Sequence, residues 1–328
     1  MAMSYSPVRW GIVSTADINR KVIPGAKASP KVDLVAVASR TQDGADQYAS
    51  WWEIPRAYGS YEALLADPEI EAVYISLPNT LHCEWSIRAV EAGKHVLCEK
   101  PLSRHPDQVA AAFEAAERAG RLLSEAFMWR HNPQTARLRE LVDDGAIGDL
   151  RLVRSAFSYG LYDDENIRLR TDVEGGALMD VGCYNVSGSR FLAGEPERVW
   201  GEAWYGPSGT DWVFAGTMRF PNDVIAAFDC GTALPNRDEL EAIGSEGSLF
   251  LDDPWHCNVP VIELRRDGKE PERIELEPQD SYRLELENVS DAIRGEAELL
   301  LARNDATAQA RVLEALHRSA TTNRPVDL

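Results

Sequence analysis

The chain has 328 residues, of which 44% are hydrophobic, so it is long enough for two domains with sizeable cores. Its 53 acidic and 34 basic residues give a formal net charge of −19, which argues against nucleic acid or an anionic membrane as a partner. The sequence lacks an apolar run of membrane-spanning length, a signal-peptide pattern and metal-ligand spacing among its five scattered cysteines. We therefore expect a cytoplasmic protein with reduced thiols and no metal.

Strands and helices alternate over the first 127 residues. Apolar runs of strand length occur at residues 8–13, 32–39, 72–77, 95–98 and 122–127. Segments with helical character lie between them, at residues 16–28, 44–52, 61–66, 81–92 and 106–119. Repeated β-α-β units with short connections predict a parallel sheet with right-handed crossovers.

The pattern changes after residue 127. One helix is expected at residues 133–143 and two more close the chain, at 282–294 and 304–322. Strand-like stretches fill the space between, at residues 150–159, 198–205, 212–220, 224–229, 239–243, 248–251, 261–265 and 273–276. Residues 128–328 are therefore predicted to form an α+β domain with a large, mostly antiparallel sheet.

The turn after the first strand carries small residues where a dinucleotide-binding fold usually carries glycines. The expected G-x-G-x-x-G/A appears here as Ser14-x-Ala16-x-x-Asn19. Small side chains still allow close approach, and the following helix N-terminus can offer N–H groups to a pyrophosphate. We expect cofactor contacts from Ser14, Thr15, Ala16, Asp17 and Ile18, the alternative being an ordinary strand-to-helix turn.

The second strand ends in Ser39-Arg40-Thr41. NAD-binding folds usually place an acid here to accept from the ribose 2′-hydroxyl. An arginine instead can bind a 2′-phosphate, and no acid is present to repel it. The sequence thus favours NADP(H) over NAD(H), with contacts from Ser39 and Arg40. The alternative is a surface pair between Arg40 and Asp43.

The strand at 72–77 ends in Leu77-Pro78-Asn79-Thr80-Leu81-His82. This loop lies at the sheet edge where a nicotinamide ribose would bind, so Leu77, Pro78, Asn79 and His82 are candidate cofactor contacts. A simpler interpretation is that Asn79 or Thr80 caps the next helix.

The strand at 95–98 ends in Glu99-Lys100-Pro101. Ligands bind at the carboxyl edge of parallel sheets, and a lysine there is available for proton chemistry or charge stabilisation. Glu99 and Lys100 are therefore further candidate contacts of the cofactor.

Several motifs together resemble the glucose–fructose oxidoreductase / inositol dehydrogenase / MocA (Gfo/Idh/MocA) family. They are AGKHVLCEKP (92–101), SLPNTLH (76–82), EAFMWRHNPQ (125–134), GAIGDLR (145–151) and EGGALMDVGCYNVSGSRFLAGEP (174–196). The last contains Asp180-Val-Gly-Cys-Tyr184, which is similar to the tyrosine-bearing branch of that family. The resemblance implies a dinucleotide-binding Rossmann domain over 1–127, then a substrate-binding and oligomerisation domain over 128–328 with an open-faced sheet.

The resemblance also implies roles for three residues. Tyr184 would be the general acid/base, Lys100 the cation that lowers the phenol's pKa, and Asp180 the residue that orients Lys100 or accepts a substrate hydroxyl. Taken alone, Tyr184 is a packed core tyrosine, and Asp180 is a helix cap or a partner of Arg190.

Residues near the expected substrate complete the candidate site. Trp129 and Arg130 are expected to contact cofactor or substrate, or else to form an interdomain packing pair. The far wall would carry Phe157, Asn166 and Arg168.

The activity implied is NADP-dependent oxidation of a sugar or cyclic polyol, of the D-xylose or D-glucose 1-dehydrogenase type. The alternatives are a 3-keto-sugar reductase, a trans-dihydrodiol dehydrogenase or, in another class, a non-catalytic nucleotide-sensing protein. Only seven residues precede the first strand, so we expect a freely exchanging cofactor rather than one held by an N-terminal arm. The C-terminal sheet is expected to form a homodimer or homotetramer.

Overall fold

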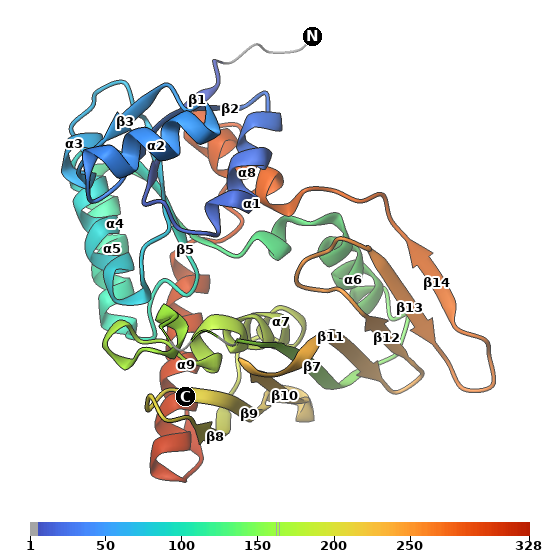
Figure 1. The fold of residues 1–328 in the computed structure, drawn as a ribbon. Coiled ribbons are helices and arrows are strands. Elements are labelled where there is room, and N and C mark those ends of the chain that lie inside the picture. The colour runs from blue at the N-terminus through green and yellow to red at the C-terminus, as the bar shows by residue number, and fades with distance from the viewer. Residues whose placement is uncertain (1–5, 162, 164) are drawn as a thin grey trace. The chain divides into compact units, whose positions relative to one another are not determined.

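The computed structural model describes residues 6–161, 163 and 165–328, which form two compact units (Figure 1). The first unit comprises the chain up to residue 103, together with residues 107–131 and 280–307. The second comprises residues 104–106, 132–279 and 308–328. The first unit therefore includes a segment from near the end of the chain. The functional division into residues 1–127 and 128–328 stays a prediction.

The first unit contains a six-stranded parallel sheet in the order β3-β2-β1-β4-β5-β6. Its strands are β1 (Val8–Val13), β2 (Val32–Ala38), β3 (Arg56–Tyr58), β4 (Ala72–Ile75), β5 (His95–Glu99) and β6 (Leu123–Ala126). This is the strand order of a doubly wound dinucleotide-binding sheet, in which ligands bind where the order reverses between β1 and β4. The predicted Rossmann topology is confirmed.

Helices cover both faces of this sheet. They are α1 (Asn19–Ala28), α2 (Gln42–Trp52), α3 (Tyr61–Leu65), α4 (His82–Glu91), α5 (Pro106–Ala119) and α8 (Ser281–Arg294), with the short η1 (Asn79–Leu81) and η2 (Met128–His131). In Figure 1, α4 and α5 lie on one side of the sheet and α1 and α8 on the other. Leu286 and Val289 of α8 belong to the core, and Trp10 Nε1 donates to Ser290 Oγ at 3.1 Å. Helix α8, which comes late in the sequence, thus completes the hydrophobic core of the first unit.

The second unit contains a nine-stranded sheet in the order β14-β13-β12-β11-β7-β10-β9-β8-β15. Its strands are β7 (Leu150–Gly160), β8 (Arg198–Tyr205), β9 (Asp211–Arg219), β10 (Ile225–Gly231), β11 (Ala233–Gly244), β12 (Ser248–Leu251), β13 (Val261–Arg265), β14 (Glu272–Glu275) and β15 (Val326–Asp327). All neighbours are antiparallel except β7 and β10, which run parallel. The predicted large, mostly antiparallel sheet is confirmed.

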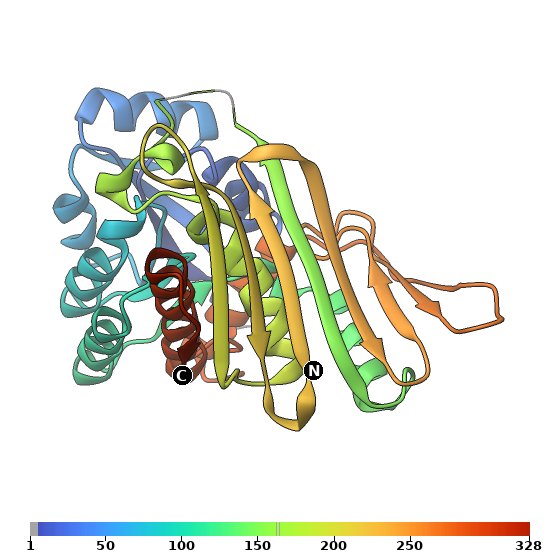
Figure 2. The ribbon, with the colours of Figure 1, turned by 90° about the horizontal axis from the view of Figure 1, so that it is seen from below.

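Helices cover one face of the second sheet. They are α6 (Pro133–Asp143), α7 (Cys183–Ala193) and most of α9 (Arg303–Thr322), with the short η3 (Ile167–Leu169), η4 (Thr171–Val173), η5 (Leu178–Gly182) and η6 (Pro221–Asp223). Figure 2 shows α7 behind the central strands. From α9, Ser319 Oγ accepts a hydrogen bond from the backbone N–H of Gly201 in β8 at 3.0 Å. Among the described residues, every helix is too short or too polar to cross a bilayer.

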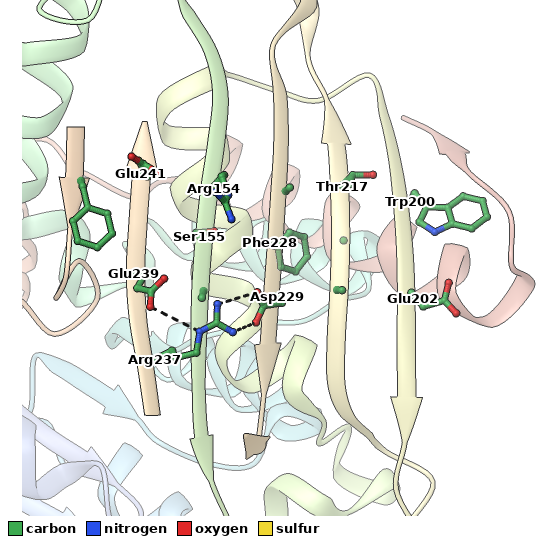
Figure 3. Close-up of a pocket in the computed structure, with 15 residues that line it drawn as sticks. Arg154, Ser155, Trp200, Glu202, Thr217, Phe228, Asp229, Arg237, Glu239 and Glu241 are labelled. Atoms are coloured by element: carbon green, nitrogen blue, oxygen red, sulfur yellow. Dashed lines mark hydrogen bonds and ion pairs between the residues drawn. The ribbon is translucent and has the colours of Figure 1, made fainter. Parts of the chain in front are cut away.

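The opposite face of the second sheet carries a hollow of about 440 Å³ (Figure 3). Side chains alternate along a strand, so Arg237, Glu239 and Glu241 of β11 line this hollow while Leu240 is buried on the other face. Arg237 pairs with Asp229 of β10 through contacts of 2.5 and 3.1 Å. The described helices of the second unit thus leave this face open.

Candidate active site

The turn after β1 holds a serine in a backbone conformation that usually requires glycine. Ser14 has φ +117°, where L side chains are disfavoured. Its hydroxyl bonds to both the carbonyl and the hydroxyl of Ser76, at 2.9 and 2.8 Å. Asn19 completes the network, because its amide N donates to the carbonyl of Ser14 and its amide O accepts from Ser76. A hydrogen-bond network thus stabilises the turn where the motif lacks glycine.

The N-terminus of α1 follows this turn without a side-chain cap. Thr15 and Asp17 are exposed, and Ala16 and Ile18 are half-buried. The next three N–H groups donate to backbone carbonyls of the turn, and that of Ala16 donates to Ser14 Oγ at 3.1 Å. A pyrophosphate at this helix N-terminus stays a prediction.

At the end of β2, Arg40 is exposed and Ser39 half-buried. Thr41 is occupied locally, since its hydroxyl accepts from the N–H of Gly44 and caps α2. Within the described part of the chain, Arg40 forms no ion pair with Asp43, so the surface pair considered from the sequence is not observed. The guanidinium is therefore available to a 2′-phosphate.

The loop after β4 is tied to the loop after β5 by His82. Its Nδ1 lies 2.9 Å from the carbonyl oxygen of Pro101, and its Nε2 lies 2.7 Å from that of Leu77. The side chain is 1% exposed, and burial lowers its pKa. His82 therefore positions the loop that contains Pro78 and Asn79, and its predicted contact with a cofactor stays a prediction. The expected cap by Asn79 or Thr80 is wrong, because α4 begins without a side-chain cap.

Lys100 directly follows β5 and is half-buried. Its backbone N–H donates to Glu99 Oε2 at 3.2 Å, and the Tyr74 hydroxyl donates to Glu99 Oε1. The Lys100–Pro101 peptide is cis. Glu99 thus forms hydrogen bonds with both the Lys100 backbone and the buried Tyr74 of β4. These hydrogen bonds fix the backbone to which the Lys100 side chain is attached.

Trp129 and Arg130 lie in η2, after β6. Trp129 is 1% exposed, and the Arg130 guanidinium lies 5.6 Å from the centroid of its ring. Arg130 also lies 3.6 Å from Asp305 at the start of α9. The structure thus places the two as a packed cation–π pair. Their predicted contacts with cofactor and substrate stay predictions.

Tyr184 lies in the first turn of α7 and Asp180 in the π-helical segment η5 that precedes it. A π turn is wider than an α turn, so residues four positions apart across this segment are not aligned as in a regular α-helix. Asp211 of β9 anchors the segment, because its carboxylate accepts from the N–H of Leu178 at 2.7 Å. Gly176 permits this contact, since a Cβ there would lie 1.9 Å from Asp211 Oδ1.

Asp180 has partners that differ from those considered from the sequence. Its Oδ2 lies 3.0 Å from Arg168 Nε and accepts from the Tyr159 hydroxyl. Asn166 joins this group, because its side chain accepts from the N–H of Arg168 at 3.1 Å. Arg190, the partner suggested from the sequence, pairs with Glu195 and Gln309, and its pair with Asp180 stays a prediction. Thus the predicted residues Asn166, Arg168 and Asp180 do form one cluster.

Aromatic rings surround Tyr184, which is 6% exposed. Phe157 packs edge-on against it at a centroid distance of 5.2 Å. Trp255 lies 5.9 Å from Tyr184 and stacks on Phe157 at 6.3 Å. Phe157 thus contacts Tyr184, and its place on the wall of a substrate site stays a prediction. The sequence analysis did not identify Trp255. The Trp255-His256 pair in a polar loop is the signal that could have found it, since binding residues often lie on loops.

The structure groups the candidate residues within each unit. Ser14, Arg40, His82 and Lys100 lie at or beyond the carboxyl ends of the parallel strands of the first unit. Tyr184 and its neighbours belong to the second. The meeting of Lys100 and Tyr184 at one substrate stays a prediction.

The fold and these clusters define a class of protein, the two-domain dehydrogenases. In this class a nucleotide-binding α/β domain is followed by a domain that contains a large β-sheet. The family model for oxidoreductases with an NAD-binding Rossmann fold matches residues 8–127, and the model for the GFO/IDH/MocA C-terminal domain matches residues 135–250. The chain belongs to the Gfo/Idh/MocA family of oxidoreductases.

Known proteins resemble this chain over nearly its whole length. A D-xylose 1-dehydrogenase (NADP(+)) from Haloferax volcanii is 37% identical over 325 residues, which cover 97% of this chain and 99% of that protein. A crystal structure of a 3-ketoreductase from Actinomadura kijaniata, in complex with NADP and TDP-benzene, is 30% identical with a TM-score of 0.90, covering 95% of this chain and 98% of that one. An aldose-aldose oxidoreductase from Caulobacter crescentus, complexed with glycerol, is 27% identical with a TM-score of 0.91, covering 98% and 100%.

Proposed function

We propose that this protein is an NADP-dependent oxidoreductase that transfers a hydride between nicotinamide and a hydroxyl or carbonyl carbon of a sugar or cyclic polyol. The observation that carries the proposal is the setting of Tyr184, a phenol on a buried helix that directly follows the segment with the Asp180–Arg168 pair. The family membership and Lys100 at the end of β5 support the same chemistry.

In this proposal NADP, when bound, accepts or supplies the hydride. Tyr184 takes the hydroxyl proton when the alcohol is oxidised and returns a proton to the carbonyl oxygen in the reverse direction. Lys100 provides a positive charge that favours the phenolate and stabilises charge developing on the substrate oxygen. Asp180, paired with Arg168, forms a polar wall of the site that hydrogen-bonds the other hydroxyls of the substrate.

The preference for NADP(H) over NAD(H) rests on Arg40. A guanidinium can form paired hydrogen bonds to a phosphate, and Arg40 is exposed at the strand end where the adenosine ribose binds in this fold. Residues 1–127 would hold the cofactor through this strand end and the turn at Ser14. Residues 128–328 would bind the substrate.

The substrate we favour is an aldose such as D-xylose or D-glucose, oxidised at the anomeric carbon. The 37% identity to a D-xylose 1-dehydrogenase over nearly the whole chain supports this choice. Reduction of a 3-keto sugar is the second candidate, which the likeness to the Actinomadura kijaniata 3-ketoreductase favours.

A kinetic panel tests the proposal. The protein is mixed with NADP⁺ or NAD⁺ and with D-xylose, D-glucose and cyclic polyols, and formation of the reduced nucleotide is followed by absorbance. A 3-keto sugar with NADPH tests the reverse reaction. We expect turnover of at least one aldose with NADP⁺. NADP binding without turnover of any compound would instead favour a nucleotide-sensing protein.

We also propose that the open face of the second sheet joins copies of the chain as a homodimer or homotetramer. This face carries Trp200 beside the charged residues of the hollow (Figure 3). A broad sheet face of mixed character is typical of a surface that a partner covers.

A further inference from the structure

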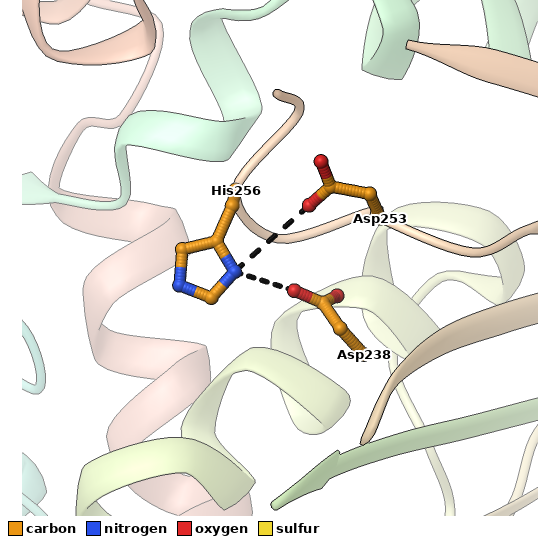
Figure 4. A group of neighbouring side chains, drawn as sticks. All are labelled: Asp238, Asp253 and His256. Atoms are coloured by element: carbon orange, nitrogen blue, oxygen red, sulfur yellow. Dashed lines mark hydrogen bonds and ion pairs between the residues drawn. The ribbon is translucent and has the colours of Figure 1, made fainter. Parts of the chain in front are cut away.

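A second polar group lies near Tyr184, within the second unit. Asp238 in β11 and Asp253 and His256 in the loop after β12 form this group, which we call the His256 group (Figure 4). His256 Nδ1 lies 2.5 Å from Asp238 Oδ2 and 3.9 Å from Asp253 Oδ1. One imidazole nitrogen thus faces two carboxylates.

Phe157 places the His256 group beside the candidate acid/base. Asp238 and Phe157 are directly opposite each other on β11 and β7, so their side chains leave the sheet on the same face. The Phe157 ring is contacted edge-on from two directions, by Tyr184 at 5.2 Å and by His256 at 5.4 Å. The imidazole and the phenol therefore flank one aromatic ring.

Backbone hydrogen bonds hold both carboxylates in position. Asp238 Oδ1 accepts from the N–H of Trp255 at 3.2 Å. Asp253 Oδ2 accepts from the N–H groups of Asn258 and Val259, at 2.5 and 2.9 Å. The second oxygen of each carboxylate faces Nδ1 and favours a proton on that nitrogen.

The far side of the imidazole is turned away from the carboxylates. Figure 4 shows Nε2 pointing away from Asp238 and Asp253, and the side chain is 47% exposed. Because Nδ1 is oriented by its two partners, Nε2 is presented in a fixed direction. A nitrogen presented in this way can form a hydrogen bond with an oxygen of a bound molecule.

The charge of the His256 group limits which molecules it can accept. Two carboxylates around one imidazole leave the group negative even when the ring is protonated. Burial raises the pKa of Asp238, and the neighbouring His256 acts in the opposite direction. A phosphate or diphosphate close to this group would be repelled, whereas a hydroxyl would not.

We propose that His256, oriented by Asp238 and Asp253, is a specificity-determining residue that hydrogen-bonds a hydroxyl of a neutral sugar or polyol and selects against phosphorylated substrates. This inference rests on the proposed role of Tyr184, because it places His256 on the wall of the same substrate site. Asp238 and Asp253 are positioning residues that act through His256.

Paired variants test the role of each imidazole nitrogen. In His256→Gln the amide nitrogen reaches the position of Nε2, whereas in His256→Asn it reaches only that of Nδ1. We expect His256→Asn to raise KM for the best neutral sugar about tenfold with kcat changed less than about twofold, and His256→Gln to restore most of the loss. Lys269→Gln, an exposed change in the hairpin between β13 and β14, is the control and should behave as wild type.

A second measurement tests selection by charge. The ratio of kcat/KM for D-glucose to that for D-glucose 6-phosphate is compared between wild type and the Asp238→Asn/Asp253→Asn double variant. We expect the ratio to fall several-fold in the double variant, because two negative charges are removed. Folding of every variant is checked by thermal unfolding.

The outcomes separate this inference from the proposed function. Wild-type failure to oxidise or reduce any sugar would overturn both. Wild-type turnover with unchanged KM in His256→Asn, or an unchanged ratio in the double variant, would overturn this inference alone. The three residues are also of types that bind metals, so kinetics are repeated with a chelator. Activity lost on chelation and restored by one divalent cation would show a metal site in place of the hydrogen bond to substrate.

Discussion

At the scale of single residues, the hydroxyl of Tyr184 is the group on which the proposed chemistry depends. The ring packs among Phe157 and Trp255, and a phenylalanine would preserve these contacts. Tyr184→Phe should therefore lower kcat by about 100-fold or more, because the proton donor and acceptor is removed. The melting temperature should change little. Steady-state kinetics with the best sugar checks this, and wild-type turnover in the variant would refute the role of Tyr184.

Arg40 should determine the choice of cofactor. Replacing it with serine removes a charged donor from the expected 2′-phosphate position. We expect Arg40→Ser to raise KM for NADP⁺ by about tenfold or more while KM for NAD⁺ changes little. Arg311→Ser, at an exposed site on α9, serves as the control. Equal effects on the two cofactors would contradict a contact with the 2′-phosphate.

The candidate residues differed in how well the sequence predicted their partners. Lys100 and Tyr184 lie in recognisable sequence motifs. Asn166, Arg168 and Asp180 were each predicted as site residues, but their contacts with one another were not. Arg190 lies ten positions after Asp180 but turns to Glu195 and Gln309. The His256 group was missed because its residues meet only when β11 and the loop after β12 come together. Such pairing depends on sheet register, which local pattern does not determine.

At the scale of elements, Asp211 links β9 to the start of the helical segment that carries Asp180 and Tyr184. Burial raises its pKa to about 7, although the N–H of Leu178 acts in the opposite direction. The unfolded value is about 3.9, so the folded protein binds more protons between about pH 4 and about pH 7. The free energy of unfolding should therefore fall across this window as the pH rises.

Asp211→Asn tests this pH dependence. The amide oxygen can still accept from the N–H of Leu178, but the side chain no longer ionises. Relative to the variant, the wild type should lose free energy of unfolding between about pH 4 and about pH 7, as measured by chemical denaturation. Asp267→Asn, in an exposed hairpin, controls for the change in net charge. Parallel curves for wild type and Asp211→Asn would rule out a contribution from Asp211.

Most elements of the fold follow from periodicity, and the exceptions have physical reasons. The run VDLVAVA forms β2, and its last four residues are all buried, because a strand in a sheet covered on both faces is mainly apolar. The edge strand β3 has only three residues, too few for a recognisable pattern. The parallel pairing of β7 with β10 and the packing of α8 into the first core join segments far apart in sequence. No local signal predicts such contacts.

At the scale of the whole molecule, the open face of the second sheet should govern assembly. Ala215 of β9 is small, exposed and lines the hollow on this face. Ala215→Glu would add a charged side chain where a second copy is expected to pack, so we expect a shift to monomer in size-exclusion chromatography with light scattering. Ala136→Glu, on the exposed side of α6, is the matched control. An unchanged mass would argue against assembly through this face.

The position of α8 in the chain affects how the protein can fold during synthesis. Trp10, near the start of β1, is buried in a core that includes Leu286 and Val289. The ribosome must translate α8 before these late side chains exist. Until then, the N-terminal part that has already emerged would carry uncovered apolar surface, a state that chaperones protect from aggregation. The part that is made first can therefore reach its final packing only after α8 has been translated.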